Sequence, residues 1–402
     1  MGGDLSGGNG AGLRSEHGLD RPPRAAARGR AGGHRPDLAS GSIRAVSEVT
    51  ARGRPLPTLS RLSKAVPFLW TSAALLTMLV LSAAVGPVRI PPLVVLKVLL
   101  AKVSAIGVVS DWPASYGVIL NDIRLPHTAL IALAGMALGG SGAAYQGLFR
   151  NPLADPYIIG VASGAGLGAV LAMTAEWPTS ALGMAAVPLA AFVSALVTVA
   201  IVYGVARVGR STPVTTLLLA GVAVGIFASA LTSLIMLLST DQLRRAISWL
   251  LGGFSLGGWG PVWASLPYLA IGLGGLILLA RPLNVLQFGD EEAMQLGLDV
   301  EKLKLVIVIL ASLVAATAVA FSGIIGFVGL IVPHLVRMRW GPDYRRLLPL
   351  ATIGGGAVLL AADAVARTVL APRDLPVGII TAVAGAPFFL WLLRRAKQEV
   401  FW

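Results

Sequence analysis

Long stretches without any charged side chain recur along this chain and decide what it can fold into. Residues 128–149, 156–175, 177–206, 211–240, 246–280 and 305–336 hold no Asp, Glu, Lys or Arg. Each reaches or exceeds the ~20 residues that an α-helix needs to cross the hydrocarbon core of a bilayer. Only 13% of all residues are charged, whereas about a quarter are charged in a soluble domain. Because the alternation of a β-barrel is absent, the sequence predicts an all-α integral membrane protein.

Gly, Pro and charged residues divide the apolar sequence into about ten predicted transmembrane helices. They lie near residues 66–85, 127–147, 158–174, 184–205, 213–239, 262–280, 303–321, 325–336, 347–366 and 376–393. The eighth of these is shorter than a full crossing requires. We expect a ten-helix transmembrane domain over residues 65–397.

The first 64 residues are rich in Gly, Arg, Pro and Ser and show no apolar periodicity. Such a segment buries too little apolar surface to fold, so we expect residues 1–64 to form a disordered basic tail. A start codon placed too early explains this tail equally well. The first apolar run is longer than a signal-peptide core and lacks a small-residue cleavage site, which favours a retained span.

Lys and Arg between the spans predict the orientation of the chain. With an even number of spans both termini share one side, and the loops on that side hold Arg150, Arg207, Arg210, Arg281, Lys302, Lys304, Arg337, Arg339, Arg345, Arg346, Arg394, Arg395 and Lys397. The opposite loops hold fewer: Arg89, Lys97, Lys102, Arg124, Arg244, Arg245, Arg367 and Arg373. Because an excess of Lys and Arg marks the cytoplasmic side, we expect both termini in the cytoplasm.

One acidic segment stands out in a chain with a formal charge of +13. The segment GDEEAMQLGLDVEK, residues 289–302, is helix-prone and lies on the predicted cytoplasmic side. Asp290, Glu291 and Glu292 form an acidic first turn, which suits the positive N-terminal end of a helix. Apolar residues follow them and offer a small apolar face. The alternative is a solvated acidic loop, although acidic residues contribute little to topology.

Several functions are excluded or disfavoured by what the sequence lacks. There is no Cys, so no disulfide, thiolate metal site or Cys nucleophile can exist. A phosphate-binding loop needs G-x-x-x-x-G-K-[ST], and the chain contains no Gly-Lys dipeptide, so we expect ATP to bind to another polypeptide. His334 stands alone beside Pro333 and is interpreted as a helix cap, and no metal site is expected. The basic residues lie between apolar segments, which argues against nucleic acid as a partner.

Five segments at predicted span boundaries carry a family resemblance. They are RLPHTALIALAGMALGGSGAAYQGLFRNPLADPYIIGVASGAGLGA from Arg124, WLLGGFSLGGW from Trp249, AMQLGLD from Ala293, GIIGFVGLIVPHLVR from Gly323 and DLPVGIITAVAGAPFFLWLLRR from Asp374. In this order they resemble the FecCD-type permease subunits of binding-protein-dependent ABC importers for iron siderophores, haem and cobalamin. The resemblance covers about residues 66–397 and implies a type II ABC importer permease fold.

The resemblance implies roles for two groups of residues on the predicted cytoplasmic side. A pair of short helices between the sixth and seventh spans would lie in a groove of a separate ATPase subunit, with Asp290, Glu291, Glu292, Ala293, Met294, Leu296, Gly297 and Leu298 as the ATPase-coupling residues. Asn151, Leu153 and Thr215 match positions of a cytoplasmic gate, although Pro213 and Val214 depart from the polar residues expected there. A purely structural turn at FRNPLADP is the alternative, since its two prolines stop the helix and Asn151 can bond freed backbone groups.

On the opposite side, the resemblance implies three docking residues for a substrate-binding protein. Arg124, His127 and Arg367 match positions that receive acidic residues from its two lobes, and the family commonly has Arg where this chain has His127. Two local alternatives compete with docking. Arg124 can extend to the membrane interface, and Asp363 stands four residues before Arg367, the favourable spacing for a pair within one helix.

Together these features imply a permease subunit of an ATP-driven importer rather than an enzyme. The expected cargo is a metal chelate, a ferric siderophore or haem before cobalamin. The expected partners are two ATP-binding subunits that hold ATP and Mg, a substrate-binding protein, a second identical or related permease copy and the lipid of a bacterial or archaeal plasma membrane, with no cofactor bound by this chain. The alternative is an ion-coupled secondary transporter, for which only Asp363 qualifies as a charged residue within the membrane.

Overall fold

The computed structural model describes residues 57–86, 88–101, 112–175, 181–239, 242–253, 257–371 and 373–400. The chain divides into two units, Met1–Pro57 and Thr58–Trp402, and the described helices belong to the second apart from their first residue. Residues 1–56 of the predicted disordered tail lie outside the described residues. Residues 57–64, which the sequence analysis placed in that tail, are helical. Pro57 is the first helical residue, a position where the missing N–H of proline costs nothing.

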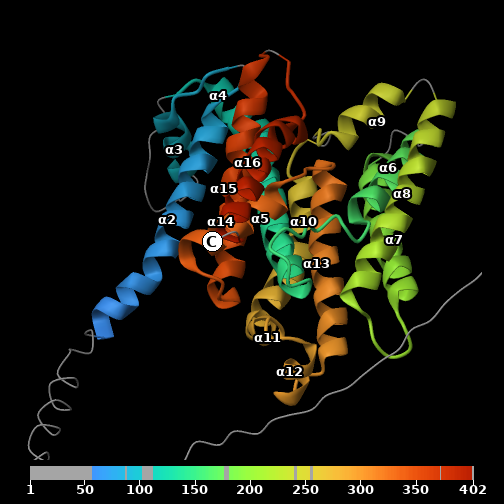
Figure 1. Cartoon of the computed structure of the whole chain (residues 1–402). Helices are drawn as coiled ribbons and strands as arrows, with labels where there is room; N and C mark the ends of the chain where they lie inside the picture. Colours follow the sequence, from blue (N-terminus) through green and yellow to red (C-terminus); the bar gives the residue numbers. More distant parts are fainter. Residues whose placement is uncertain are drawn as a thin grey trace, which may run out of the picture. The chain divides into compact units, whose positions relative to one another are not determined.

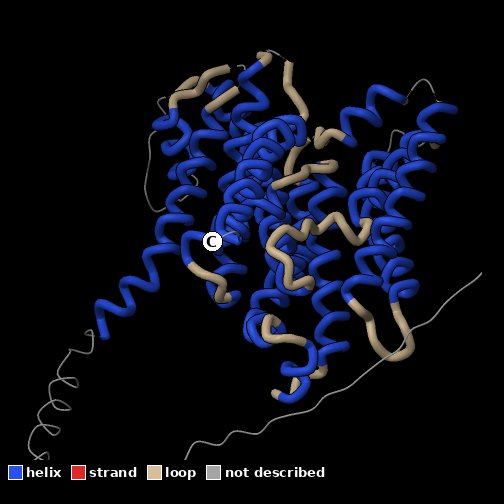
Figure 2. Tube along the Cα trace, in the orientation of Figure 1, coloured by secondary structure: helices blue, strands red, loops and turns tan. Residues whose placement is uncertain are grey.

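The described part of the second unit is built from helices, with one isolated β-bridge between Val208 and Ser211 (Figures 1 and 2). In chain order the helices are α2 (Pro57–Ala84), α3 (Pro92–Ala101), α4 (Ala114–Val118), the π-helix η1 (Ile119–Arg124), α5 (Leu125–Leu148), α6 (Val161–Thr174), α7 (Ala181–Ala206), α8 (Val214–Leu238), α9 (Leu243–Leu250), α10 (Gly260–Leu278), α11 (Ala280–Leu286), α12 (Asp290–Gln295), α13 (Val300–Ser322), α14 (Val328–Trp340), α15 (Tyr344–Val369) and α16 (Val377–Val400).

Eight segments of the described residues are long and apolar enough to cross a membrane, which confirms the all-helical membrane class. They are Ala65–Ala84, Ala114–Leu148, Ala185–Ala206, Val214–Leu238, Gly260–Leu278, Val300–Ser322, Tyr344–Val369 and Val377–Arg394. The other two predicted spans correspond to α6, with 14 residues, and α14, with 13 residues. At about 1.5 Å per residue each covers only about 20 Å, less than the hydrocarbon core.

Four short helices, α3, α4, η1 and α9, lie where the sequence analysis predicted no element, and α3 and α9 are the longest of them. α3 is apolar but has only 10 residues, and Lys97 interrupts it. α9 is strongly amphipathic, since Ala246 and Trp249 are buried while Leu243 and both arginines of LRRAISWL are exposed. Both helices are too short to span a bilayer, so a search for long apolar runs does not find them.

α5 is the most buried of the long helices and forms the centre of the packing. It contacts α10, α13, α14 and α15. Small residues allow this approach: a methyl group added at Gly135 would overlap the backbone carbonyl of Gly355, and one added at Gly139 would overlap that of Ala351. This close contact of small residues is the usual way in which helices associate in lipid.

α8 lies at the other extreme of burial. Only 17% of its apolar window is buried, against 83% for the segment that contains α5. Large apolar side chains such as Leu219, Ile226, Phe227, Leu237 and Leu238 are exposed along α8. In one copy of the chain this helix therefore presents an apolar face that must meet lipid or another protein surface.

Candidate functional site

The acidic segment folds as a short helix that projects at one end of the bundle, which we call the α12 end (Figure 1). α11 and α12 follow each other between α10 and α13, where the resemblance implies a pair of short helices. α12 begins after Gly289, whose φ of 128° is a conformation that side-chain-bearing residues rarely adopt. It ends before Gly297, and Asp299 then caps α13 by accepting from the backbone N–H of Lys302 at 3.1 Å.

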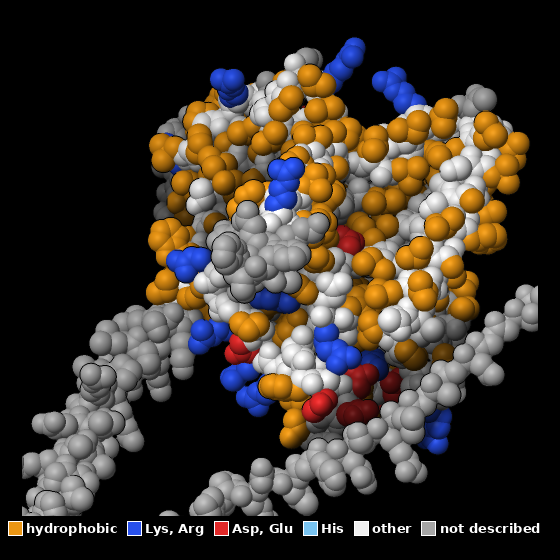
Figure 3. All heavy atoms as spheres, viewed as in Figure 1, with side chains coloured by type: hydrophobic (Ala, Val, Ile, Leu, Met, Phe, Trp, Pro, Cys, Tyr) orange, Lys and Arg blue, Asp and Glu red, His pale blue; other side chains and the backbone are white. Residues whose placement is uncertain are grey.

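The predicted apolar face of this segment is divided between the inside and the outside. Ala293 is fully buried and Leu298 packs against the core. Met294 is 55% exposed, Leu296 is 67% exposed, and Phe288, which the sequence analysis did not single out, is 72% exposed. Three large apolar side chains thus point outward at a charged end of the molecule, which favours a protein partner there. Figure 3 shows Asp and Glu side chains gathered with Lys and Arg at this end, below a largely hydrophobic surface.

Hydrogen bonds fix α11 to the central helix and to α15. Gln287 donates from Nε2 to the carbonyl of Gly147 at 2.9 Å, near the C-terminal end of α5. Asn284 donates to Asp343 at 2.7 Å and accepts from the backbone N–H of Tyr344 at 2.8 Å. Burial alone would raise the pKa of Asp343, but the Asn284 hydrogen bond, the backbone N–H of Arg345 and nearby cationic charge lower it. α11 is therefore held as part of the bundle rather than as a loose loop.

Lys304, in the first turns of α13, is the centre of a charge network that the sequence analysis missed. Its side chain is 6% exposed, and its Nζ lies 2.6 Å from Asp290 and 3.1 Å from Glu301. Nζ is also 3.5 Å from the carbonyl of Thr212, in the α7–α8 turn (residues 207–213). A signal was present in the sequence, because Lys304 is a cation at the start of a long apolar run with a carboxylate three residues before it.

The α5–α6 turn (residues 149–160) contains two of the predicted gate residues. Asn151 is exposed, and its side-chain oxygen accepts from the backbone N–H of Leu153 at 2.9 Å. This bond supports the structural-turn alternative and leaves a gate role open. Arg150, the residue before it, has a φ of 50°, in the left-handed region, and its guanidinium lies 3.3 Å from Asp290.

The third predicted gate residue, Thr215, is exposed on the first turn of α8. Its neighbour Thr212 is buried and donates its backbone N–H to Glu301 at 2.8 Å. The α5–α6 turn, which holds Asn151 and Leu153, and the α7–α8 turn, which directly precedes the helix of Thr215, thus connect to the junction of α12 and α13. The connections run through Arg150 and Thr212, not through the gate residues themselves.

At the opposite end, Arg124 is only 5% exposed and is directed into the protein. One guanidinium nitrogen donates to the carbonyls of Ala83 and Ala84, at 2.9 Å each, and the other donates to the carbonyl of Val88. These carbonyls belong to the C-terminal end of α2 and the residues after it, which have no helical partner. In this conformation Arg124 caps α2 and does not present its charge at the surface.

Arg367 is likewise buried and bonded to backbone carbonyls near the C-terminal end of α2. It is 9% exposed and donates to the carbonyls of Ser82 and Val85 at 3.0 and 3.1 Å. It also pairs with Asp363 at 2.8 Å, as the four-residue spacing predicts. Asp363 in turn lies 3.0 Å from Nε2 of His127, whose side chain is 28% exposed. Of the three predicted docking residues, only His127 keeps a substantial exposed surface.

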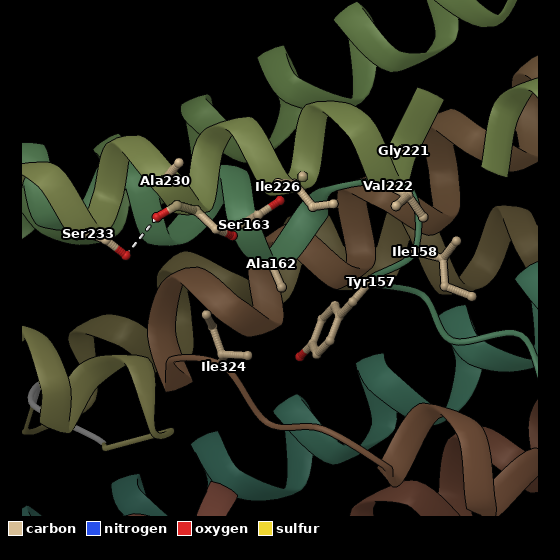
Figure 4. Close-up of a pocket in the computed structure, with 12 residues that line it drawn as sticks. Tyr157, Ile158, Ala162, Ser163, Gly221, Val222, Ile226, Ala230, Ser233 and Ile324 are labelled. Atoms are coloured by element: carbon tan, nitrogen blue, oxygen red, sulfur yellow. Dashed lines mark hydrogen bonds between the residues drawn. The ribbon is translucent and has the colours of Figure 1, made fainter. Parts of the chain in front are cut away.

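A hollow of ≈ 670 Å³ opens between the N-terminal end of α6 and the exposed face of α8 (Figure 4). Tyr157, Ile158 and Ser163 line one wall, and Val222, Ile226 and Ser233 of α8 line the other. Tyr157 is held by a hydrogen bond from its hydroxyl to the carbonyl of Ile325 at 3.0 Å. The lining is largely apolar with a few hydroxyl groups and no charged side chain.

Metal binding finds no support in the described side chains, among which no group of three or more His, Asp and Glu could hold an ion. The helix-cap interpretation of His334 is wrong, because this residue lies inside α14 and not at its end; its ring donates a hydrogen bond to the backbone carbonyl of Pro152 in the α5–α6 turn.

Comparisons with known proteins agree on one family. Residues 74–395 match the model of the FecCD transport family. The chain is similar to the cobalamin import system permease protein BtuC of Halobacterium salinarum, with 43% identity over 81% of this chain and 95% of that protein. It is also similar to the hemin transport system permease protein HmuU of Yersinia pestis, with 42% identity over 69% of this chain and 84% of that protein.

A solved structure gives the same result for the fold. An inward-facing metal-chelate type ABC transporter superposes with a TM-score of 0.68 at 29% identity, covering 82% of this chain and 98% of that one. The expected type II ABC permease fold is therefore confirmed.

Proposed function

The chain belongs to the FecCD transport family, and we propose that it forms, with a second copy of itself, the path by which an ABC importer takes up a metal chelate. It is the permease subunit of an ABC transporter and not itself an ATPase, and its partners are an ATPase and a binding protein. The observation that carries the proposal is the α11–α12 pair, which stands at one end of the bundle. Its Asp290 contacts Arg150 of the α5–α6 turn directly and reaches the α7–α8 turn through Lys304 of α13.

α12 is the element that we assign to contact with the ATPase. The exposed Phe288, Met294 and Leu296 supply an apolar contact surface, and Asp290, Glu291 and Glu292 supply acidic groups around it. Ala293 and Leu298 pack toward the core, and Gly297 is exposed in the turn after the helix, with a φ of 85°. Because an ATPase works in the cytoplasm, this assignment makes the α12 end cytoplasmic and agrees with the excess of Lys and Arg predicted for that side.

The gate proposal places Asn151, Leu153 and Thr215 at the inner end of the path. Its support is the position of both turns next to the α12–α13 junction. The exposed apolar face of α8 and the hollow beside it supply the wall of the path, which a second copy of the chain completes.

Docking of the binding protein belongs at the opposite end, and the geometry assigns the three predicted residues unequal parts. His127 has an exposed edge that an acidic partner can reach. Arg124 and Arg367 would have to leave the carbonyls of α2 before they could bind a partner.

For the cargo we propose a metal chelate, with haem and ferric siderophores tested before cobalamin. The relatives named above carry cobalamin and haemin. The hollow beside α8 has apolar walls and hydroxyl groups, which suit a bulky chelate whose metal is already coordinated. Ion-coupled transport finds no support in the membrane, because Asp363 is held by Arg367 and His127.

Reconstitution tests the proposal directly. The chain is purified with its ATPase and its binding protein, placed in vesicles, and supplied in turn with radiolabelled haemin, a labelled ferric siderophore and labelled cobalamin. We expect uptake of one probe that requires ATP, the ATPase and the binding protein. Leu296→Asp, directly after α12, should abolish co-purification of the ATPase, whereas Val208→Asp, at another exposed apolar position that lies outside the membrane spans, serves as the control for a surface charge. Uptake by the chain alone under an ion gradient would overturn the proposal.

A further inference from the structure

One carboxylate, that of Asp290, joins α12 to two other parts of the chain, the α5–α6 turn and α13. Asp290 is the first residue of α12, and its two oxygens contact different cations. Oδ1 lies 3.3 Å from Arg150 of the α5–α6 turn, and Oδ2 lies 2.6 Å from Lys304 of α13. The residue therefore bridges α12 to two parts of the chain that are more than a hundred positions apart in sequence.

Burial makes the Lys304 contact obligatory. The Lys304 side chain is 6% exposed, and an ammonium group removed from water is stable only when carboxylates or carbonyls surround it. Asp290, Glu301 and the carbonyl of Thr212 supply those partners. If α12 moved away alone, Lys304 would lose a carboxylate and remain buried. A displacement of α12 is therefore favoured to carry Lys304 and its other partners with it.

The partners of Lys304 extend the connection to the start of α8. Glu301 uses its second oxygen to accept the backbone N–H of Thr212 at 2.8 Å. Thr212 is 3% exposed and is followed by Pro213, the N-cap of α8. The position of the Thr212 backbone thus depends on Glu301 directly and on Asp290 through Lys304. Since α8 lines the hollow, a shift at Thr212 reaches the wall of the proposed path.

The Arg150 contact extends the connection to the other turn. Its backbone adopts a φ of 50°, which is uncommon for a residue with a side chain. The strained residue comes directly before Asn151, the start of the turn that contains Leu153. Such strain persists only where surrounding contacts hold it, and the ion pair with Asp290 is one of these contacts.

We propose that Asp290 is the positioning residue that links the motion of α12 to both the α5–α6 turn and the α7–α8 turn. This inference rests on the proposed function and adds a specific route to it. The neighbouring Glu291 and Glu292 are exposed, and no ion pair joins them to another described side chain. The three acidic residues of α12 are therefore not equivalent. Of the three, Asp290 alone forms ion pairs with described residues, with Arg150 of the α5–α6 turn and with Lys304, which contacts the α7–α8 turn.

The test separates ATP hydrolysis from the response of the turns. Asp290→Asn and Lys304→Met are prepared in the complete complex, with Lys302→Met as the matched control. Lys302 lies two residues before Lys304 and pairs with Asp299, but its side chain is 83% exposed. Uptake per ATP hydrolysed should fall about tenfold in Asp290→Asn and Lys304→Met and stay unchanged in Lys302→Met. Lys304→Arg keeps the cation and should retain most of the uptake.

A second readout does not depend on the cargo. The chain has no Cys, so Leu153→Cys and, separately, Thr215→Cys give single thiols whose reaction rate with a fluorescent maleimide reports on each turn. ATP should change both rates in the otherwise unaltered complex and change neither in Asp290→Asn, while the ATPase still co-purifies. Uptake of none of the three probes would count against the proposed function, and thiol reactivity would still decide the role of Asp290. An ATP response that persists at both thiols in Asp290→Asn would overturn the inference.

Discussion

The two ends of the helical bundle bury cations in different ways. At the end opposite α12, Arg124 and Arg367 bond mainly to backbone carbonyls at the C-terminal end of one helix, α2. At the α12 end, Lys304 bonds to carboxylates from α12 and α13 and to a turn carbonyl. One arrangement completes the end of a helix, whereas the other connects elements that are separate in the chain.

This difference indicates which end is built to transmit motion. Backbone carbonyls at a helix end need donors in every state, so the arginines that satisfy them act as fixed anchors. Side-chain ion pairs between elements can move as a unit or exchange partners. The comparison therefore assigns a structural role to buried charge at one end and a mechanical role at the other.

The largest effect is expected when Arg367, one of the two arginines that bond the carbonyls at the end of α2, is replaced. Arg367→Met removes the donor to Ser82 and Val85 and leaves Asp363 buried with His127 as its remaining side-chain partner. Breaking a buried pair in this way costs about 3–5 kcal/mol of stability. We expect a large drop in the thermal unfolding temperature of the purified protein in detergent. Arg89→Met, which alters an exposed arginine at the same end, is the control.

An unchanged unfolding temperature would contradict the structural role that the comparison of the two ends assigns to Arg367. If Arg367→Met unfolds at the wild-type temperature but no longer binds the substrate-binding protein, then Arg367 leaves the α2 carbonyls readily and serves in docking. The same logic applies to Arg124→Met, which would free the carbonyls of Ala83 and Ala84.

Much of the fold follows from the sequence because lipid imposes a simple rule. Every long apolar run must satisfy its own backbone and does so as a helix. All ten predicted spans therefore correspond to helices. The break between α13 and α14 covers residues 323–327, a few residues further along the chain than the predicted break between residues 321 and 325. The lengths of α6 and α14 and the existence of α9 depend on packing against neighbours, and an apolar window does not report them.

The candidate site is less accessible to sequence reasoning for a physical reason. The position of α12 could be inferred from its acidic residues and from a family resemblance, since both are local features. The partners of Asp290 lie at positions 150 and 304, and only the packing of α5 against α13 brings these residues to it. Similarly, Arg124 and Arg367 stand at span ends in sequence, and nothing local reveals that the end of α2 covers them.

A smaller effect concerns a carboxylate at the α12 end that lacks a cation. Asp155 accepts from the backbone N–H of Tyr157 at 2.8 Å, and no ion pair joins it to another described residue. Burial raises its pKa from the ordinary 3.8 to about 6, and the Tyr157 hydrogen bond offsets only part of this rise. A raised pKa means that the folded state binds the proton more tightly than the unfolded state. Its contribution to stability is thus present below the ordinary pKa and is lost as pH rises through about 6.

Asp155→Asn removes this titration. We expect the difference in unfolding temperature between the variant and the wild type to grow in favour of the variant from about pH 4 to about pH 7. The measurement is a series of thermal unfolding curves in detergent across that range. A difference that stays constant with pH would mean that Asp155 is solvated or paired, like the carboxylates around Lys304, and the contrast within this end would disappear.

The smallest effect is expected for the exposed ion pair between Asp299 and Lys302, which lies close in sequence to the buried Lys304. Asp299 and Lys302 form an ion pair at 2.7 Å, with side chains 52% and 83% exposed. The hydrogen bond from the Lys302 side chain, together with the Lys302 backbone N–H, lowers the pKa of Asp299, and the same contact raises the pKa of Lys302. A lowered carboxyl pKa contributes stability only above its ordinary value, so both groups stay charged between about pH 5 and about pH 8.

Water and salt screen such an exposed pair. Lys302→Met should therefore leave the unfolding temperature and the uptake per ATP within experimental error at both ends of that pH range, whereas Lys304→Met changes both. The two lysines lie on the same helix and each pairs with a carboxylate, Lys302 with Asp299 and Lys304 with Asp290 and Glu301, but they differ in burial. If Lys302→Met reduces uptake per ATP as much as Lys304→Met does, burial is not what distinguishes the network, and any charge near α12 would serve to transmit its motion.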